Sequence, residues 1–243
     1  MSRLVAFAVV ASAAVAGCSG DLVEQSGLPI EEDFSGDECP WLEEQSTEVS
    51  LRCREGAYEF EIRVRELGFQ MVPQRLDARE EAVGVEAVVA VDGFPEPTGD
   101  DVEFHGVFCD SAPPDEPAVK GYLLGLTRGP ISSDRAGETF PRRAEARDGL
   151  AIIRFDGERP RDRGRVDPLV DEYSDVVRPS NRIGAECRTV EGGVELSLLV
   201  DEVEVASAFD AQGFAPFEAV GLVVVSSSPG TRFVIDDFKA WEP

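Results

Sequence analysis

The acidic side chains of this 243-residue chain are its clearest candidates for hydrolytic chemistry. Retaining hydrolysis of a glycosidic bond uses two carboxylates about 5 to 5.5 Å apart. The nearest candidates are Asp201, Glu202 and Glu204 in the segment VDEVEV. Asp201 and Glu202 are adjacent, so they lie on opposite faces of a strand or in a turn. We therefore expect a solvated hairpin edge at this segment and assign no catalytic residue.

His105 is the single histidine of the chain. This count excludes a multi-histidine metal centre, and any Ser-His-Asp relay would have to run through that one side chain. His105 alternates with Phe104 and Gly106 in a segment with the pattern of a strand, so its side chain faces away from Phe104. We expect a structural histidine whose ring is hydrogen-bonded.

Two pairs of aspartates are candidates for a calcium site, because calcium is a hard cation that takes several oxygen ligands. The pairs are Asp100 with Asp101 and Asp236 with Asp237. The alternative is that each pair solvates the end of a strand. We expect no cofactor, and calcium is the exception that these pairs leave open.

Aromatic and basic side chains are candidates for ligand binding. Tyr173, in the segment DEYSD of a predicted long loop, is the best exposed platform for stacking on a sugar. Residues 128–165 hold ten arginines against seven acidic residues, so they form a locally basic stretch. Their loops could contact an anionic polymer or partner, and the alternative, which we favour, is that they are simply solvated. The arginines in these loops that are candidates for ligand binding are Arg142, Arg143, Arg161 and Arg163.

The chain as a whole is strongly acidic. It has 23 Lys and Arg against 48 Asp and Glu, which gives a net charge of -25. A phosphate backbone would be repelled by this charge, so nucleic acid is excluded as a partner. Arginine greatly outnumbers lysine, which indicates a GC-rich bacterial genome.

The N-terminal segment MSRLVAFAVVASAAVAGCSG has the pattern of an export signal. Arg3 supplies a positive charge, residues 4–15 are apolar, and small residues follow. The apolar run is too short to span about 30 Å of hydrocarbon as a helix. We therefore expect a cleaved signal in place of a retained membrane span.

The last residues of that segment, Val15-Ala16-Gly17-Cys18, resemble the lipobox of bacterial lipoproteins. The resemblance implies that a signal peptide over residues 1–17 is removed and that Cys18 carries diacylglycerol, with fatty acyl groups such as palmitate. Such an anchor would hold the protein on the cell membrane, facing outside the cytoplasm. Residues 18–30 would form a flexible tether. The alternative is secretory cleavage near Ala16, with Cys18 an incidental thiol.

Four further cysteines follow in a compartment where disulfides persist. Four cysteines permit three pairings. Proximity favours Cys39 with Cys53, which leaves Cys109 with Cys187. A zinc site built from all four is disfavoured, because close pairs of the C-x-x-C type are absent.

The remaining chain alternates apolar and polar residues over short stretches divided by Gly, Pro and Asp. This pattern predicts half-buried antiparallel strands, and strands without helical crossovers favour a two-sheet sandwich. We expect a single domain over residues 31–243. The predicted strands are 48–54, 57–64, 83–91, 102–109, 119–127, 150–155, 181–190, 194–200, 202–206, 219–226 and 232–241, with long loops over 128–148 and 157–180.

The closing stretch resembles the end of concanavalin A-like sandwich domains, which include laminin-G-like and glucanase-type members. The matching pieces are residues 198–202, 219–223 and 235–241, and the opening segment EDFSGDECPW resembles the usual start of these domains. The resemblance implies an all-β, two-sheet antiparallel jelly roll whose end strands pair. Trp41 and Trp241, near those ends, are expected to close the sandwich. Segments FHGVFCD and NRIGAECRT resemble strands that often carry a facing cysteine pair, which supports Cys109 with Cys187.

The glucanase-type members carry a Glu-x-Asp-x-x-Glu motif, and this chain has no such motif. A turn glycine of the family is also missing after Asp201, where Glu202 stands. The expected function is that of a lipid-anchored module that binds a glycan or another envelope polymer without catalysis. A protein-interaction module acting through the arginine-rich loops is the alternative, and a glycoside hydrolase is a further one.

Overall fold

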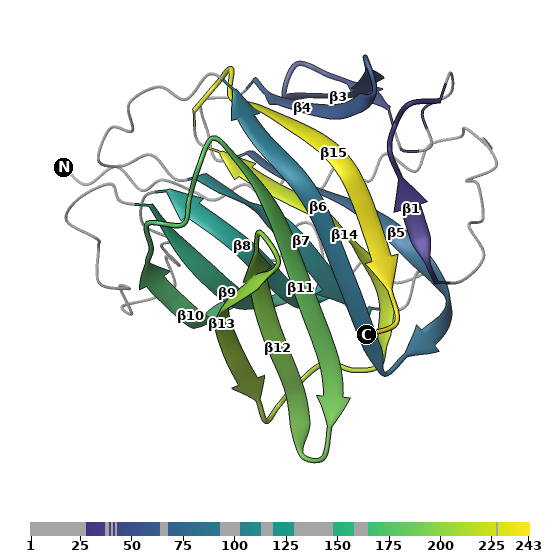
Figure 1. Cartoon of the computed structure of the whole chain (residues 1–243), viewed down its shortest axis with the longest axis vertical. Helices are drawn as coiled ribbons and strands as arrows, with labels where there is room; N and C mark the ends of the chain where they lie inside the picture. The colour runs from purple at the N-terminus through teal and green to yellow at the C-terminus, as the bar shows by residue number, and fades with distance from the viewer. Residues whose placement is uncertain are drawn as a thin grey trace.

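The computed structural model describes residues 28–36, 39, 41, 43–63, 68–92, 103–112, 119–128, 148–157, 165–226 and 228–243. The regular secondary structure of these residues is β-strand throughout, and the strands form two antiparallel sheets packed face to face (Figure 1). The predicted all-β sandwich is therefore confirmed. The described part of the chain contains no helix that is long and apolar enough to cross a membrane.

The larger sheet, sheet A, has nine strands in the order β13-β12-β11-β6-β15-β4-β3-β2, and β1 pairs with one end of β15. Its strands are β1 (Ile30–Glu32), β2 (Glu44–Gln45), β3 (Val49–Arg54), β4 (Ala57–Ile62), β6 (Ala82–Asp92), β11 (Ser180–Val190), β12 (Gly193–Val200), β13 (Val203–Asp210) and β15 (Arg232–Trp241).

The smaller sheet, sheet B, has six strands in the order β10-β9-β8-β7-β14-β5. Its strands are β5 (Gly68–Glu80), β7 (Glu103–Asp110), β8 (Val119–Arg128), β9 (Asp148–Gly157), β10 (Arg165–Tyr173) and β14 (Phe217–Ser226). The predicted loop over 157–180 therefore contains a strand, β10, and Tyr173 is its last residue.

Alternate residues of both sheets point into the space between them, which follows from the period of two along a strand. In β6, for example, Val83, Val85, Ala87 and Val89 are all at most 2% exposed. The disulfide between Cys109 of β7 and Cys187 of β11 crosses this core and links the two sheets, with 6.7 Å between the Cα atoms. The expected pair Cys39 and Cys53 is also bonded.

The two ends of the described chain meet in sheet A. β1 pairs with β15, from Ile30 opposite Ala240 to Glu32 opposite Phe238. Trp41 is buried beside them, and its ring centroid lies 4.9 Å from those of Phe34 and Phe238. Trp41 thus closes this end of the core as expected.

Trp241 does not close the core. It follows the buried Ala240 and therefore lies on the outer face of sheet A, opposite Gly84 of β6. A Cβ atom on Gly84 would lie only 2.2 Å from Cε2 of the indole, so the ring packs directly on the glycine backbone. The expectation of an interior Trp241 is wrong, because a β-bulge between Asp236 and Lys239 shifts the alternation along β15.

Candidate functional site

The outer face of sheet B is apolar, although it is the face turned away from the inter-sheet core. Its side chains form a second hydrophobic cluster, and each is at most 9% exposed. We call this cluster the apolar face. Its members are Phe104, Phe108, Leu123, Ala151, Ile153, Phe155, Val223 and Val225.

Small residues cross the middle of this face in one row. The register aligns Gly106 of β7 with Gly125 of β8, Gly125 with Ala151 of β9, and Ala151 with Asp171 of β10. Glycine is required at the first two positions, because a Cβ atom on Gly106 would lie 2.2 Å from the Leu124 carbonyl oxygen. The row leads to the exposed carboxylate of Asp171 at the sheet edge.

The carboxyl groups near the opposite end of this face are engaged in structure. Asp110 Oδ1 accepts hydrogen bonds from the backbone N–H groups of Ala112 (2.9 Å) and Lys120 (3.0 Å), which fixes the connection from β7 to β8. Burial raises the pKa of Asp110 to about 6, and the negative charge of Glu218 adds to the shift. Glu218 is itself paired with Arg79 at 2.8 Å. These two carboxyls therefore act as a turn cap and an ion-pair partner.

Tyr173 occupies the edge of sheet B, with 53% of its surface exposed. It lies opposite Gly149 of β9, which in turn lies opposite Thr127 of β8, so the three residues form one row on the outer face. Asp171 is on the same face two residues earlier, about 7 Å along the strand. Thr127 is 1% exposed, and its hydroxyl oxygen has no hydrogen-bond partner among the described residues. We call Tyr173 and Asp171 the β10 edge site.

The β10 edge site combines side chains of the kinds that can contact a sugar. An exposed phenol ring can stack on the C–H face of a pyranose, and a carboxylate can accept hydrogen bonds from hydroxyl groups. Tyr173 was expected to be exposed, but in a loop; the structure instead fixes it on a strand. Asp171 was missed by the sequence reasoning, because the strand register that places it on this face cannot be read from the sequence.

A charged network holds β10 against the rest of the fold. Arg154 of β9 donates to Asp167 of β10 (2.6 Å) and to Asp210 of β13 (3.2 Å). The Tyr122 hydroxyl donates to Asp210 Oδ2 at 3.1 Å and accepts from the Phe214 N–H at 2.8 Å. Since β13 belongs to sheet A, these contacts link the edges of the two sheets and fix the strand that carries Tyr173.

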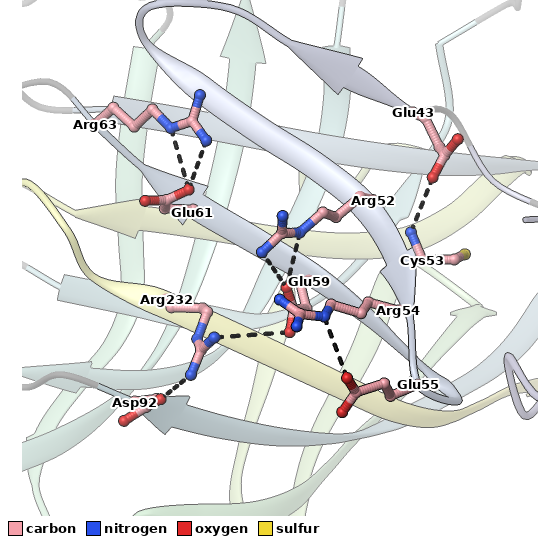
Figure 2. A network of polar contacts seen from close by, with 10 residues as sticks. All are labelled: Glu43, Arg52, Cys53, Arg54, Glu55, Glu59, Glu61, Arg63, Asp92 and Arg232. Atoms are coloured by element: carbon pink, nitrogen blue, oxygen red, sulfur yellow. Dashed lines mark hydrogen bonds and ion pairs between the residues drawn. The ribbon is translucent and has the colours of Figure 1, made fainter.

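The outer face of sheet A is covered by ion pairs. Figure 2 shows Glu59 of β4 at the centre of one network, where it accepts from Arg52 Nη2 at 2.8 Å and lies 3.8 Å from Arg232 Nη1. Arg232 also pairs with Asp92, and Arg63 pairs with Glu61 at 2.7 Å. Acidic and basic side chains on these neighbouring strands therefore neutralise one another.

A second network of ion pairs on the same face includes Asp237, one of the aspartates considered as a calcium ligand. Arg182 of β11 pairs with Glu86 at 2.8 Å and with Asp237 at 2.7 Å, and Lys239 lies 3.3 Å from Asp237. The Arg182 guanidinium holds the pKa of Asp237 below its usual value. A carboxylate committed to two cations is a poor calcium ligand. Asp236 is exposed, and no group of three or more metal-binding side chains occurs in the described ranges.

His105 lies inside the sandwich, on the same face of β7 as Cys109, with its ring centroid 5.8 Å from that of Phe233. It is 3% exposed, and neither ring nitrogen has a hydrogen-bond partner among the described residues. Burial lowers the pKa of His105 to about 4, and the charge of Arg128 contributes to the shift. The structural location was predicted; the expected hydrogen bond is absent.

The other predicted site residues divide into two groups. Asp201 and Glu202 form the two-residue turn between β12 and β13, as expected for a hairpin edge. The remaining candidates lie outside the described residues, and they are Cys18, Asp100, Asp101, Arg142, Arg143, Arg161 and Arg163.

No protein-family model and no curated protein sequence matches this chain. Several solved structures share its fold. A glycoside hydrolase family 16 endo-glucanase from Bacteroides ovatus aligns with a TM-score of 0.50 and 12% identity over 87% of this chain and 99% of its own. A mixed-linkage glucan GH16 protein, also from Bacteroides ovatus, has a TM-score of 0.51 and 9% identity over 87% of this chain and 99% of its own.

A legume lectin-like domain from Entamoeba histolytica aligns with a TM-score of 0.50 and 9% identity, over 81% of this chain and 88% of its own. Identities this low establish the architecture alone. The fold of the chain is therefore a concanavalin A-like sandwich, as the resemblance predicted.

Proposed function

We propose that this protein is a lipid-anchored extracytoplasmic module that binds a glycan or another envelope polymer without catalysis. The observation that carries the binding function is the β10 edge site, where a half-exposed tyrosine and an exposed carboxylate share one face of a fixed strand. The names of the similar structures, a glucanase and a lectin-like domain, support a carbohydrate as the class of ligand.

A non-catalytic role is supported by the chemistry of the apolar face. Retaining hydrolysis would need two carboxylates about 5 to 5.5 Å apart. The described residues of the central strands place glycine, aliphatic and phenylalanine side chains across this face, while Asp110 and Glu218 are held by backbone N–H groups and Arg79. Binding at the sheet edge requires no such pair.

Membrane anchoring is supported by the sequence at Cys18. The lipobox-like segment and the apolar run before it form a consistent export and lipidation signal. A lipid with two or three chains would hold the protein on the bilayer, because each buried methylene contributes about 0.8 kcal/mol. Expression in a bacterial host tests this role: the Cys18→Ala variant should leave the membrane fraction, and intact-mass analysis should show the lipid on the unaltered protein alone.

A glycan-array screen with the full chain tests the binding role, and the best-binding glycan then serves to compare variants. Tyr173→Ala should weaken binding about tenfold, since loss of a stacked ring removes about 1 kcal/mol or more. Tyr173→Phe keeps the ring and should bind within about twofold. Asp171→Asn should also weaken binding, whereas Asp175→Asn, an exposed neighbour beyond the strand end, is the matched control. Equal binding by Tyr173→Ala and the unaltered chain would refute this site.

Salt dependence separates this function from the alternative, a protein-contact module acting through the arginine-rich stretch 128–165. Stacking of a neutral sugar on Tyr173 should respond little to ionic strength, whereas electrostatic docking of an anionic partner should weaken steeply. Binding that disappears with added salt and is unaffected by Tyr173→Ala would favour the alternative.

A further inference from the structure

Strand β13 forms an open edge of sheet A. It pairs with β12 on one side, and no described strand pairs with its other side. Alternate residues of such a strand direct their N–H and C=O groups toward the open side. Four of its eight residues are exposed, three are of intermediate exposure, and Asp210 at the end is buried. β13 therefore presents an accessible row of backbone hydrogen-bonding groups.

Exposed apolar side chains concentrate on this strand. The described residues include three exposed large hydrophobic side chains, and two of them, Val203 (62%) and Phe209 (54%), are on β13. The Phe209 ring lies over the backbone of Gly193, because a Cβ atom there would be 2.9 Å from Cζ of the ring. The two exposed apolar side chains thus lie near the two ends of β13, with the Phe209 ring directed over β12.

β13 lacks the proline and the lysine that often protect an edge strand, although its pairing with β12 contains a register shift between Leu198 and Leu199. Natural edges are blocked by lysine, proline or charges that point along the edge. The edge strands of sheet B contain Pro73 in β5 and Pro168 in β10, whereas β13 has the sequence VEVASAFD. Its one charged side chain before Asp210, Glu204, accepts a hydrogen bond from the Ser197 hydroxyl at 2.9 Å and is therefore drawn over β12, away from the open side.

The ends of β13 are fixed, so the edge is a preformed template. At one end, the Asp201 side chain accepts a hydrogen bond from the Arg182 N–H at 3.0 Å, which holds the turn into β13. At the other end, Asp210 is bound by Arg154 and Tyr122. A fixed template loses less conformational entropy when a partner binds.

The acidic side chains around this edge favour a basic partner. Asp201, Glu202 and Glu204 are all exposed at the turn end, and the exposed Glu195 lies opposite Phe209. Arg154 at the far end is already paired with Asp167 and Asp210. A second copy of this acidic chain would be repelled, whereas a basic segment would be attracted.

We propose that β13 binds an extended, basic segment of a partner protein, which adds to sheet A as a further strand. Backbone hydrogen bonds would supply the affinity, and lysine or arginine side chains opposite the acidic turn would supply the selectivity. This surface lies on sheet A and the β10 edge site on sheet B, and Arg154 bridges the two edges through Asp167 and Asp210.

The test uses the full chain and a fluorescent ten-residue peptide that alternates lysine with valine or tyrosine, with binding followed by anisotropy. A second peptide has the same lysines but proline at every other position, so it keeps the charge and cannot form a strand. We expect the first peptide to bind at least about tenfold more tightly than the second and to slow amide hydrogen exchange in β13. Equal binding of the two peptides, or no protection of β13, would overturn the proposal.

Variants of the protein give an independent readout. Glu204→Lys should weaken binding of the first peptide about tenfold, whereas Glu242→Lys, an equal charge change at an exposed position near the chain end, should change it less than about twofold. Equal effects of the two variants would show general electrostatic attraction and would contradict the proposal. Sedimentation of the chain alone provides a second outcome: a dimer that Glu204→Lys dissociates would make a second copy the occupant.

Discussion

The two outer faces of the sandwich occupy equivalent positions and have opposite chemistry. The outer face of sheet A carries ion pairs across neighbouring strands, such as Arg52 with Glu59 and Arg182 with Asp237. The apolar face of sheet B carries phenylalanine, leucine, isoleucine and valine side chains that are at most 9% exposed. On the outer face of sheet A, charged side chains therefore pair with one another. Sheet B, in contrast, has buried side chains on both of its faces.

This difference explains where recognition can take place. Paired charges on sheet A have little free capacity for a ligand, and buried aliphatic groups on sheet B offer a sugar no hydrogen bonds. Exposed aromatic rings are found instead at the sheet edges, with Tyr173 on β10 and Phe209 on β13. Both of our binding proposals follow from this distribution.

Buried polar groups in the sandwich differ in whether they have partners. Glu59 of sheet A has an 11% exposed side chain and two arginines beside it. His105 and Thr127 of sheet B are at most 3% exposed and have no hydrogen-bond partners in the described part of the chain. The hydroxyls of Ser50 and Thr189 in sheet A are also buried without a described partner, so groups of this kind, each costing about 1 to 3 kcal/mol, occur in both sheets.

The largest predicted effect is on the free energy of unfolding, when a carboxylate introduced on the outer face of sheet B is compared with one introduced on the outer face of sheet A. Leu123→Asp should lower the free energy of unfolding by about 4 kcal/mol or more, because it buries an unpaired carboxylate in the apolar face. Val88→Asp, on the outer face of sheet A opposite Arg182, should cost less than about 1 kcal/mol. Urea unfolding measures both. Similar losses for the two variants would remove the distinction between the faces.

The second predicted effect is the dependence of the free energy of unfolding on pH. Since the pKa of His105 is about 4 in the folded state and about 6.5 in the unfolded state, the unfolded chain binds the extra proton as pH falls between these values. Acidification from pH 6.5 to 4 should therefore remove up to about 3 kcal/mol of stability, and His105→Phe should abolish this contribution.

The measurement is the difference in unfolding free energy between His105→Phe and the unaltered chain across that pH range. The difference is needed because Asp110, with its raised pKa of about 6, acts in the opposite direction: its stability contribution falls as pH rises from about 4 to 6. A difference that stays constant with pH would mean that His105 titrates normally.

A smaller effect on stability should distinguish an ion pair with a mostly buried carboxylate from an ion pair whose side chains are both exposed. Arg52→Ala leaves the mostly buried Glu59 with Arg232 at 3.8 Å, and we expect a loss of about 1 to 2 kcal/mol. Arg54→Ala removes a pair whose side chains are 52% and 82% exposed, and it should change stability by less than about 0.5 kcal/mol. Thermal unfolding of both variants tests this ranking.

The smallest predicted effect is a gain in stability from a substitution in the turn between β12 and β13. Asp201 and Glu202 both have positive φ, at 51° and 68°, a conformation that favours glycine. The turn between β3 and β4 has glycine at its second position, Gly56. Glu202→Gly should therefore stabilise the protein by about 0.5 to 1 kcal/mol, whereas Glu204→Gly within the strand should destabilise it. A loss of stability in Glu202→Gly would contradict this account of the turn.

The sequence predicted the strands that alternate cleanly and missed β1, β2, β5 and β10. All eleven predicted strands are present, and β6 and β15 lie within one residue of their predicted ends. β5 and β10 were missed because each contains a proline, which removes a backbone donor and argues against a strand. Both are edge strands, where proline is tolerated because one side of the strand needs no partner. The very short strands β1 and β2 were also missed.

The candidate site was predicted in part. Tyr173 was identified as an exposed aromatic residue, yet its alignment with Gly149 and Thr127 depends on pairing between strands far apart in the chain. His105 was predicted correctly to face away from Phe104, because alternation fixes the face of a strand. Its missing hydrogen bonds depend on the opposite sheet, and local sequence carries no information about that contact.

The disulfide between Cys109 and Cys187 has a consequence for how the protein matures. Chains are synthesised at about 5 to 20 residues per second, so the 78 residues between these cysteines take roughly 4 to 16 s to emerge. The 14 residues between Cys39 and Cys53 take about 1 to 3 s at the same rate. Cys39 and Cys53 emerge before Cys109, so oxidation in order of appearance would give the native connectivity.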